Sequence, residues 1–132
     1  MTFQVELVSP EAVTYQGEAD MVIVRTVGGG DIAFQAGHVP FIGVLDVWSV
    51  DVVRSDGGRD KFAVHRGFVQ IAGTKISILS DVSEAAGEID AERARQAKSA
   101  EEAVLVTDKN DEAAVGALAR AEIRLIVSGT EY

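Results

Sequence analysis

Apolar and polar residues alternate in the first part of the chain. Phe3, Val5 and Leu7 alternate with Gln4 and Glu6, which is the period of a half-buried β-strand. Short runs rich in β-branched residues follow, each bounded by turn residues. The further strands expected from these runs lie at 12–16, 19–26, 47–54, 61–65, 68–71 and 75–80. Many short strands at this spacing predict an antiparallel sandwich or barrel of about 85 residues.

Glycine-containing turns predict two short hairpins among these strands. Asp56-Gly57-Gly58 separates one pair of strands, and Ala72-Gly73-Thr74 separates the next pair. Glycine reaches positive φ without strain, so both segments suit the tight turns that fix the register of a hairpin.

The composition changes after Gly87. Residues 1–87 hold 11 of the 13 glycines and both prolines, whereas residues 88–132 hold 10 alanines and no proline. Alanine has the highest helix propensity, and glycine and proline punctuate turns. The chain is therefore predicted to be α+β, with a β-sandwich domain at 1–87 followed by an α-helical hairpin at 88–132.

Two helices are expected in the second part. The first extends from Asp90, its N-cap, to about Val106, and the second extends from about Glu112 to Val127, after a polar break. The packed side of the first helix is expected to consist of Ala94, Ala97, Glu101 and Val104. The packed side of the second is expected to consist of Ala114, Leu118, Ala121 and Leu125.

The packed side of the first helix is mostly alanine, which buries little apolar surface. The hairpin is therefore expected to dock weakly. Weak docking is typical of an element that moves, but an inert C-terminal cap has the same sequence signature.

Charge and composition exclude several functions. The chain has 12 basic and 21 acidic residues, a net charge of −9 that disfavours nucleic-acid binding or membrane binding through a basic face. Cysteine is absent, which excludes disulfides, thiolate metal sites and a cysteine nucleophile. No apolar run is long enough for a membrane span and no signal peptide is evident, so a soluble, cytoplasmic protein is expected.

No pattern of catalytic or metal-ligating residues is present. The phosphate-binding loop, HExxH and EF-hand patterns are missing, and Gly28-Gly29-Gly30 precedes a strand rather than a helix. His38 and His65 are far apart in the sequence, with no nucleophile or second acid nearby. The sequence thus predicts no enzyme active site. The segment 36–40, with its glycine and proline, is either a well-defined loop end or a rigid contact loop.

Several stretches, in order along the chain, match those of a known family. Residues 30–40 resemble its glycine-acidic-aliphatic-glycine-aliphatic-leucine-proline-glycine-histidine-alanine-proline stretch, and residues 88–94 contain its isoleucine-aspartate-x-x-arginine-alanine signature. Further likenesses lie at 3–9, 15–17, 65–71, 76–81 and 117–125. In order, spacing and length the chain resembles the ε subunit of bacterial F-type ATP synthases, the counterpart of mitochondrial δ. The departures from the family pattern are Ala33 and Arg66, where glycine is usual, and Gln35-Ala36, where leucine-proline is usual.

The resemblance implies a ten-stranded β-sandwich followed by a two-helix hairpin. It also implies a non-catalytic rotor subunit of the central stalk, acting in proton-driven ATP synthesis at the cytoplasmic face of the bacterial plasma membrane without inserting into it. In the family the sandwich binds the γ subunit and the c-ring. The helices fold on the sandwich or extend toward the α and β subunits, where they inhibit ATP hydrolysis.

The resemblance also implies partner contacts for particular residues. Asp31 matches an acidic loop position that faces the c-ring, and His38 matches a position near γ and the ring. The basic residues that would meet an acidic segment of β are Arg95, Lys98, Arg120 and Arg124.

A regulatory ATP site is a further implication of the resemblance, with no cofactor required. In some members the compact hairpin binds ATP at the signature matched here by Ile89, Asp90, Arg93 and Ala94. Arg93 would pair with phosphate, and Ile89 and Ala94 would flank the adenine. The other interpretation of the same residues is a helix cap with a solvated arginine.

Two other functions share the physical features but lack the ordered matches. The first is a free-standing β-sandwich interaction module with a helical tail, unrelated to ATP synthase. The second is a small enzyme built on a β-sandwich, which would need a convergent set of polar residues.

Overall fold

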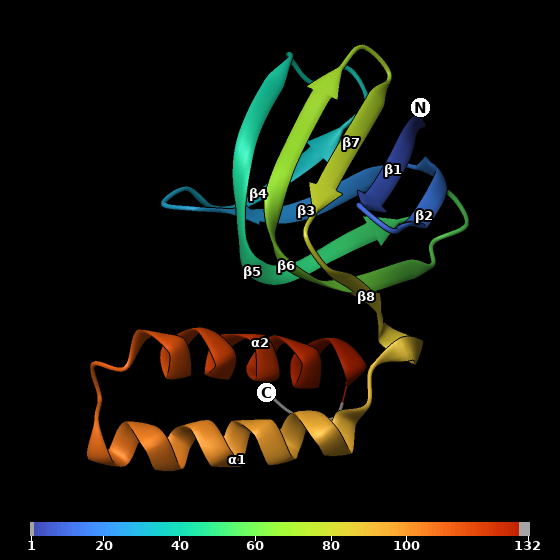
Figure 1. Ribbon diagram of the computed structural model, residues 1–132. Coiled ribbons are helices and arrows are strands. Elements are labelled where there is room, and N and C mark those ends of the chain that lie inside the picture. The colour runs from blue at the N-terminus through green and yellow to red at the C-terminus, as the bar shows by residue number, and fades with distance from the viewer. Residues whose placement is uncertain (1, 130–132) are drawn as a thin grey trace.

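The computed structural model describes residues 2–129 and has a strand-rich part followed by a helical hairpin (Figure 1). The strands are β1 (Phe3–Ser9), β2 (Ala12–Ala19), β3 (Met21–Thr26), β4 (Gly30–Gln35), β5 (Phe41–Val53), β6 (Arg59–Ala72), β7 (Lys75–Ser80) and β8 (Ser83–Ala85). A short 3₁₀ helix, η1 (Ala86–Glu88), leads into α1 (Ala91–Thr107) and α2 (Glu112–Ser128). The predicted α+β class, with strands before helices, is confirmed.

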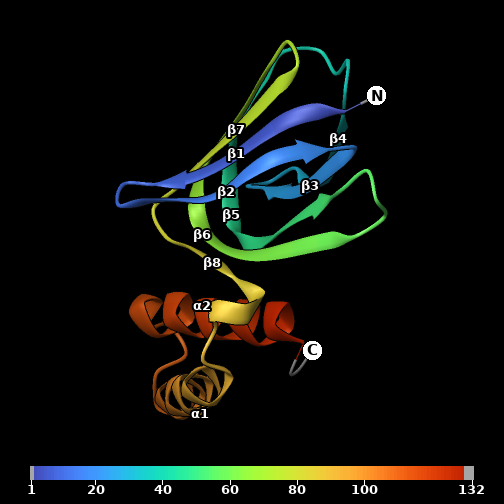
Figure 2. The ribbon, with the colours of Figure 1, turned by 90° about the vertical axis from the view of Figure 1, so that its right-hand side faces the viewer.

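The strands form one continuous path that folds over into two layers (Figure 2). The order is β2-β1-β7-β6-β5-β3-β4, with β8 paired to β6. Neighbouring strands are antiparallel except β1 and β7, which run parallel. The alternation expected in the first strand is present, because Phe3, Val5 and Leu7 are at most 4% exposed in the core.

The two longest strands, β5 and β6, bend and contribute to both layers (Figure 1). One half of their pairing contains Leu45 opposite Gly67 and the other half contains Val47 opposite His65. The predicted strands 61–65 and 68–71 are therefore two halves of β6 rather than separate strands. Residues 2–129 form eight strands where the resemblance implied ten, and counting each half of β5 and β6 separately accounts for the difference.

Both helices begin at aspartates that cap them. The Asp90 carboxylate accepts a hydrogen bond from the Arg93 amide at 3.1 Å, and Asp111 accepts one from the Ala114 amide at 3.1 Å. Each cap satisfies a backbone donor that the first helical turn would otherwise leave unpaired. The expected N-cap at Asp90 is confirmed.

The packed side of α1 differs from the expected one at one position. Val104 is 39% exposed, while Leu105 is half-buried. At 100° per residue, Leu105 lies about 20° around the helix from the buried Ala94, whereas Val104 lies about 80° away. The prediction that Val104 lies on the packed side is therefore wrong, and Leu105 occupies that side instead.

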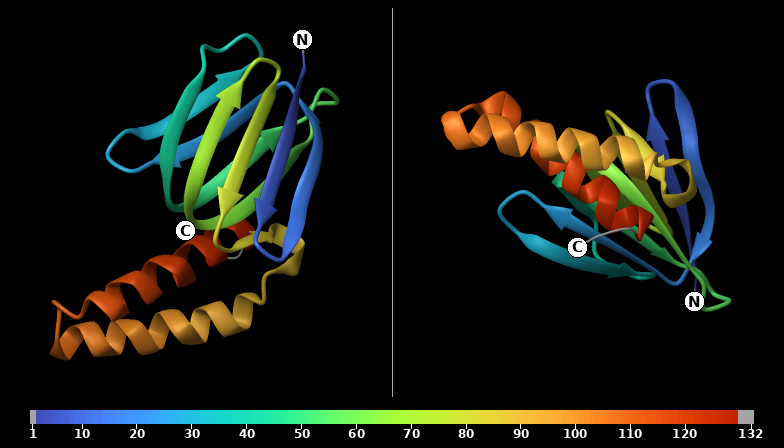
Figure 3. Two further views of the ribbon diagram at one scale, coloured as in Figure 1. Left: turned by 45° about the horizontal axis from the view of Figure 1, so that its top comes forward. Right: turned by 90° about the horizontal axis from the view of Figure 1, so that it is seen from below.

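Helix α2 lies between the sandwich and α1 (Figures 1 and 3). The residues Ile123 and Val127 pack with Ala63 of β6, against the sheet. The expected stripe is largely buried on the opposite side, where α1 packs, with Ala114, Ala121 and Leu125 at most 3% exposed. The second buried side of α2 was not predicted from the sequence.

Candidate interaction surfaces

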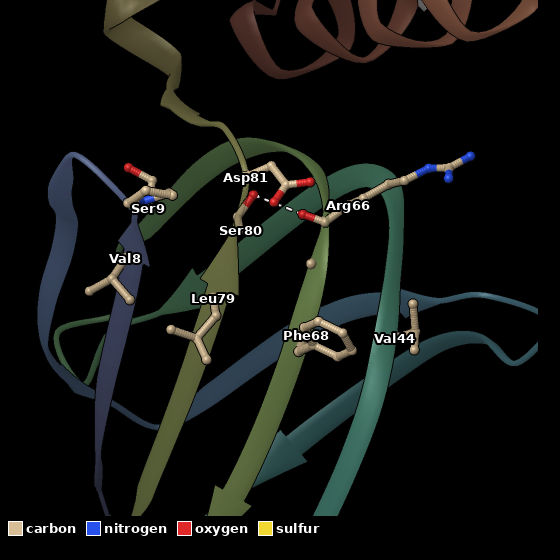
Figure 4. A pocket seen from close by; sticks show the side chains of 10 residues that line it. Val8, Ser9, Val44, Arg66, Phe68, Leu79, Ser80 and Asp81 are labelled. Carbon is tan, nitrogen blue, oxygen red and sulfur yellow. Dashed lines mark hydrogen bonds between the residues drawn. The ribbon is translucent and has the colours of Figure 1, made fainter.

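A row of exposed apolar side chains crosses four strands on the outer surface of one layer (Figure 4). Val44 of β5 lies opposite Phe68 of β6, Phe68 lies opposite Leu79 of β7, and Leu79 lies opposite Val8 of β1. The exposed fractions of Val44, Phe68 and Leu79 are 50%, 54% and 50%. We call these four residues the apolar row.

The apolar row points outward because its neighbours fill the core. Leu7, Leu45, Val69 and Ile78 are at most 1% exposed, and successive residues of a strand point to opposite faces. The row lines a groove of about 420 Å³. A cluster of exposed apolar groups of this kind is typical of a protein–protein interface.

At one end of the groove, the Ser80 hydroxyl fixes a bend of the backbone by hydrogen bonding. Ser80 Oγ donates to the carbonyl oxygen of Arg66 at 2.9 Å and lies 2.7 Å from that of Val82 (Figure 4). Arg66 and Asp81 bring one charge of each sign to this end of the groove. The guanidinium of Arg66 extends away from the apolar row in Figure 4.

Sequence reasoning missed the apolar row. The available signal was two adjacent apolar residues in each strand, as in Leu7-Val8, Phe68-Val69 and Ile78-Leu79. In a strand covered on one face only, one member of each pair must be exposed.

Asp31 lies at the start of β4 and is bound within its own hairpin. Arg25 is its cross-strand neighbour and donates from Nε to Oδ1 at 2.9 Å and from an Nη to Oδ2 at 3.4 Å. The Arg25 guanidinium also lies 3.6 Å from the centroid of the Trp48 ring. The predicted contact residue is thus 52% exposed but already paired with a cation.

His38 lies beyond the other end of β4 and packs among aromatic rings. Its ring meets Phe34 edge-on at 5.0 Å, and its Nδ1 donates to the Val39 carbonyl at 2.7 Å. The extended stretch from Asp31 to Gln35 spans roughly 13 Å, and His38 follows the turn after it. The structure does not bring these two predicted contact residues together.

Three of the four residues assigned to the ATP signature line one pocket. Asp90, Arg93 and Ala94 face a cavity of about 350 Å³ that is also lined by Glu84 and Arg124. Among the described residues, Arg93 forms no ion pair. The pocket therefore holds two guanidinium groups.

The fourth signature residue, Ile89, lies elsewhere. It packs against the cluster of Ala63, Ile123 and Val127 between the sheet and α2. The Asp90 carboxylate is occupied as the cap of α1.

Glu84 joins three elements at the edge of this pocket. Its Oε1 accepts a hydrogen bond from Arg124 Nε of α2 at 2.7 Å and one from His65 Nε2 of β6 at 2.9 Å. These interactions, with the His65 hydrogen bond the largest, lower the pKa of Glu84 to about 2. A phosphate group in the pocket would have to compete with an ionised Glu84 for Arg124.

The four basic residues assigned to a contact with β are differently engaged. Arg95 pairs with Glu92 of its own helix at 2.6 Å, and Arg124 pairs with Glu84. Arg120 is exposed and forms no ion pair with the described residues, whereas Lys98 is half-buried on α1. With the helices docked, Arg95 and Arg124 are already neutralised by acidic neighbours.

Neither helix in the described part of the chain is long and apolar enough to span a membrane.

Comparison with protein families gives a match over the strand-rich part. Residues 2–86 match the model described as ATP synthase, Delta/Epsilon chain, beta-sandwich domain. Relatives named ATP synthase epsilon chain match over most of this chain, as three examples show. The protein of Streptomyces griseus is 41% identical over 92% of this chain and 90% of its own length. That of Thermobifida fusca is 48% identical over 76% of each chain, and that of Shouchella clausii is 35% identical over 96% of this chain and 95% of its own.

Solved structures share the fold. A chain of the Euglena gracilis mitochondrial ATP synthase, in a structure of its OSCP, F1 and c-ring, matches with a TM-score of 0.71 and 21% identity over 96% of this chain and 76% of that chain. A chain of the central stalk and c-ring structure of the Tetrahymena thermophila mitochondrial ATP synthase matches with a TM-score of 0.60 and 14% identity over 95% of each chain.

Proposed function

Since this chain belongs to the ATP synthase delta/epsilon family, we propose that it is a non-catalytic rotor subunit of the central stalk of an F-type ATP synthase. In this role the sandwich joins the γ subunit to the c-ring during proton-driven ATP synthesis. The protein then lies at the cytoplasmic face of the bacterial plasma membrane, held there by its partners. Family membership leaves no support for an unrelated interaction module or a small enzyme.

The apolar row is the observation that carries this proposal. Val44, Phe68 and Leu79 each expose about half of their surface in a protein of net charge −9. Fully burying such a side chain contributes roughly 1.5–3 kcal/mol, so covering the half that remains exposed favours binding by roughly half of that per residue. We assign this surface to the contact with γ.

Replacement of Phe68 by serine tests the assignment. Phe68→Ser removes the largest side chain of the apolar row from a half-exposed site and is expected to weaken binding of γ severalfold, which lowers the amount of γ that copurifies with the tagged chain. Val106→Ser is the matched control, because Val106 is 85% exposed on α1, outside the row. Copurification of γ with Phe68→Ser at the wild-type level would rule out this surface as the γ contact.

We further propose that Asp31 contacts the c-ring and that His38 supports the loop near γ and the ring. The proposal for Asp31 is supported by its exposure at the start of β4, next to the turn that precedes it. The proposal for His38 is supported by the packing of its ring against Phe34. The helices would regulate hydrolysis by leaving the sandwich and reaching the α and β subunits, with Arg95, Lys98, Arg120 and Arg124 exchanging their present neighbours for an acidic segment of β.

Regulatory ATP binding in the helical pocket is a separate proposal. Arg93 supplies a guanidinium that forms no ion pair with any described residue, and Arg124 supplies a second one if ATP displaces Glu84. Isothermal titration of the full chain with ATP tests it, with Arg93→Gln as the variant expected to lose the signal. An absence of heat at millimolar ATP would remove the proposal.

A further inference from the structure

Arg25 of β3 contacts two groups at once. Its guanidinium binds Asp31 through both carboxylate oxygens and lies 3.6 Å from the centre of the Trp48 ring. A planar guanidinium can do both, because its edge carries the N–H donors while its face stacks on an aromatic ring. Its position therefore depends on both neighbours.

Trp48 connects this pair to the helical hairpin. Trp48 packs against the cluster formed by Ala63 of β6 and by Ile123 and Val127 of α2. The register of β3 against β5 is irregular between Ile23 and Thr26, and Trp48 lies within the stretch of β5 that this irregularity spans. Asp31, Arg25, Trp48 and α2 thus form a continuous series of contacts.

The first contact in the series is open to competition. Arg25 is 34% and Asp31 is 52% exposed, so solvent and a partner can reach the carboxylate. Exposed ion pairs contribute only about 0.2–1 kcal/mol, and a guanidinium over an exposed aromatic ring adds about 0.5–1 kcal/mol. A cationic side chain on a partner can therefore replace Arg25 at Asp31 at little cost.

We propose that Arg25 and Trp48 are positioning residues that link Asp31 to the docking of α2. A cationic group of a partner that pairs with Asp31 releases Arg25, which then leaves the Trp48 ring and loosens α2 on the sandwich. The partner step rests on the proposed function, in which Asp31 is a contact residue. The link within the chain stands on the contacts described above.

Hydrogen exchange of the α2 amides in the full chain tests the internal link. Asp31→Asn and Arg25→Met are each expected to speed exchange about two- to fivefold, because each removes the Arg25 contact with the Trp48 ring, the first by releasing Arg25 and the second directly. In the double variant the α2 amides are expected to exchange no faster than in either single variant. Arg59→Met is the matched control, since Arg59 also pairs with an aspartate on the sheet, Asp51, and is expected to leave α2 unchanged.

Two results of this experiment would overturn the link. One is unchanged α2 exchange in Asp31→Asn. The other is an Asp31→Asn effect that persists undiminished in the Arg25→Met background. Arg25→Lys keeps the positive charge but lacks the planar guanidinium. The α2 amides of this variant are expected to exchange faster than in the wild type, as in Arg25→Met. This variant tests the link if Arg25→Met fails to fold.

Binding to ATP synthase stripped of this subunit tests the partner step. Asp31→Asn is expected to weaken binding, whereas Arg25→Met is expected to tighten it about two- to fivefold, because the internal competitor for Asp31 is gone. Weaker binding of Arg25→Met would overturn the competition. Unchanged binding of Asp31→Asn would refute the proposed contact of Asp31 and with it the partner step, while the exchange experiment decides the internal link separately.

Discussion

At the scale of single residues, Glu84 carries more interactions than any sequence pattern indicated. It lies on β8, between the strands and the helices, and accepts hydrogen bonds from His65 and Arg124. His65 is only 6% exposed, and its Nδ1 has no hydrogen-bond partner among the described residues. The ionised carboxylate therefore connects β6 and α2 to β8, the short strand that precedes the helices.

The depressed pKa of Glu84 makes this tie sensitive to acid. The pKa falls from 4.5 to about 2 in the folded state, so ionised Glu84 stabilises the fold fully above pH 4.5 and this stabilisation is lost as the pH falls toward 2. Glu84→Gln is expected to lower the free energy of unfolding at pH 7 by about 1–3 kcal/mol and to flatten its pH dependence between 2 and 5. Urea unfolding followed by circular dichroism measures both. Glu92→Gln, in an exposed pair on α1, serves as the control and should change stability by less than about 0.5 kcal/mol.

Arg66 and Gly67 form the corner of β6 with unusual backbone angles. Arg66 has φ 68° and Gly67 has φ 144°, and a Cβ on Gly67 would collide with the carbonyl oxygen of Leu79. Arg66→Gly is expected to raise stability by about 1 kcal/mol, because a left-handed conformation costs a non-glycine residue about this much. Gly67→Ala is expected to lower stability by about 2–4 kcal/mol. Thermal unfolding of the two variants measures both changes. Shifts of the midpoint temperature that are equal and in the same direction would contradict the prediction.

At the scale of elements, the structure departs from the sequence predictions where contacts are distant in the sequence. The capping aspartate at 90 and the packed stripe of α2 follow local rules, and both were predictable. Residues 62–65 of β6 are all buried, and this run gives no alternation because the core covers one face and α2 helps to cover the other. No local rule predicts the role of Asp31 or of the signature residues, and Ile89 lies apart from the other signature residues because its packing depends on where α2 lies.

The second buried side of α2 adds apolar contacts with the sheet that the expectation of a weakly docked hairpin did not include. Ile123 is 1% exposed between α2 and the sheet. Ile123→Ala is expected to cost about 2–4 kcal/mol through lost burial and the cavity left behind. Val115→Ala, on a 51% exposed site of the same helix, should cost much less. Urea unfolding measures both variants, and equal costs would show that α2 is not anchored through Ile123.

At the scale of the whole molecule, the chain consists of a sandwich, a middle helix and an outer helix in successive layers (Figure 3). The net charge of −9 argues against a basic binding face, but it gives no indication of the apolar row. Outward-facing apolar residues become a surface only when β1, β5, β6 and β7 are aligned in register, and that alignment is a property of the sheet.

Removal of the hairpin tests the regulatory proposal on the whole complex. A chain that ends at Gly87 keeps the apolar row and Asp31 and is expected to assemble with ATP synthase. Hydrolysis of ATP by the complex should then rise, because no helix remains to reach the α and β subunits. Ile123→Ala in the full-length chain is the control, because it loosens the hairpin without removing it. Unchanged ATP hydrolysis by the complex with the truncated chain would show that the hairpin does not inhibit hydrolysis.

Trp48 is the single tryptophan of the chain and lies where the sandwich meets α2. The Arg25 guanidinium covers its ring, and the residue packs against the cluster that includes Ile123 and Val127 of α2. Tryptophan emission shifts to longer wavelength when the indole meets water, so the native protein carries an optical reporter of hairpin position at this boundary. Departure of α2 can therefore be followed in real time, without a label, in the isolated subunit.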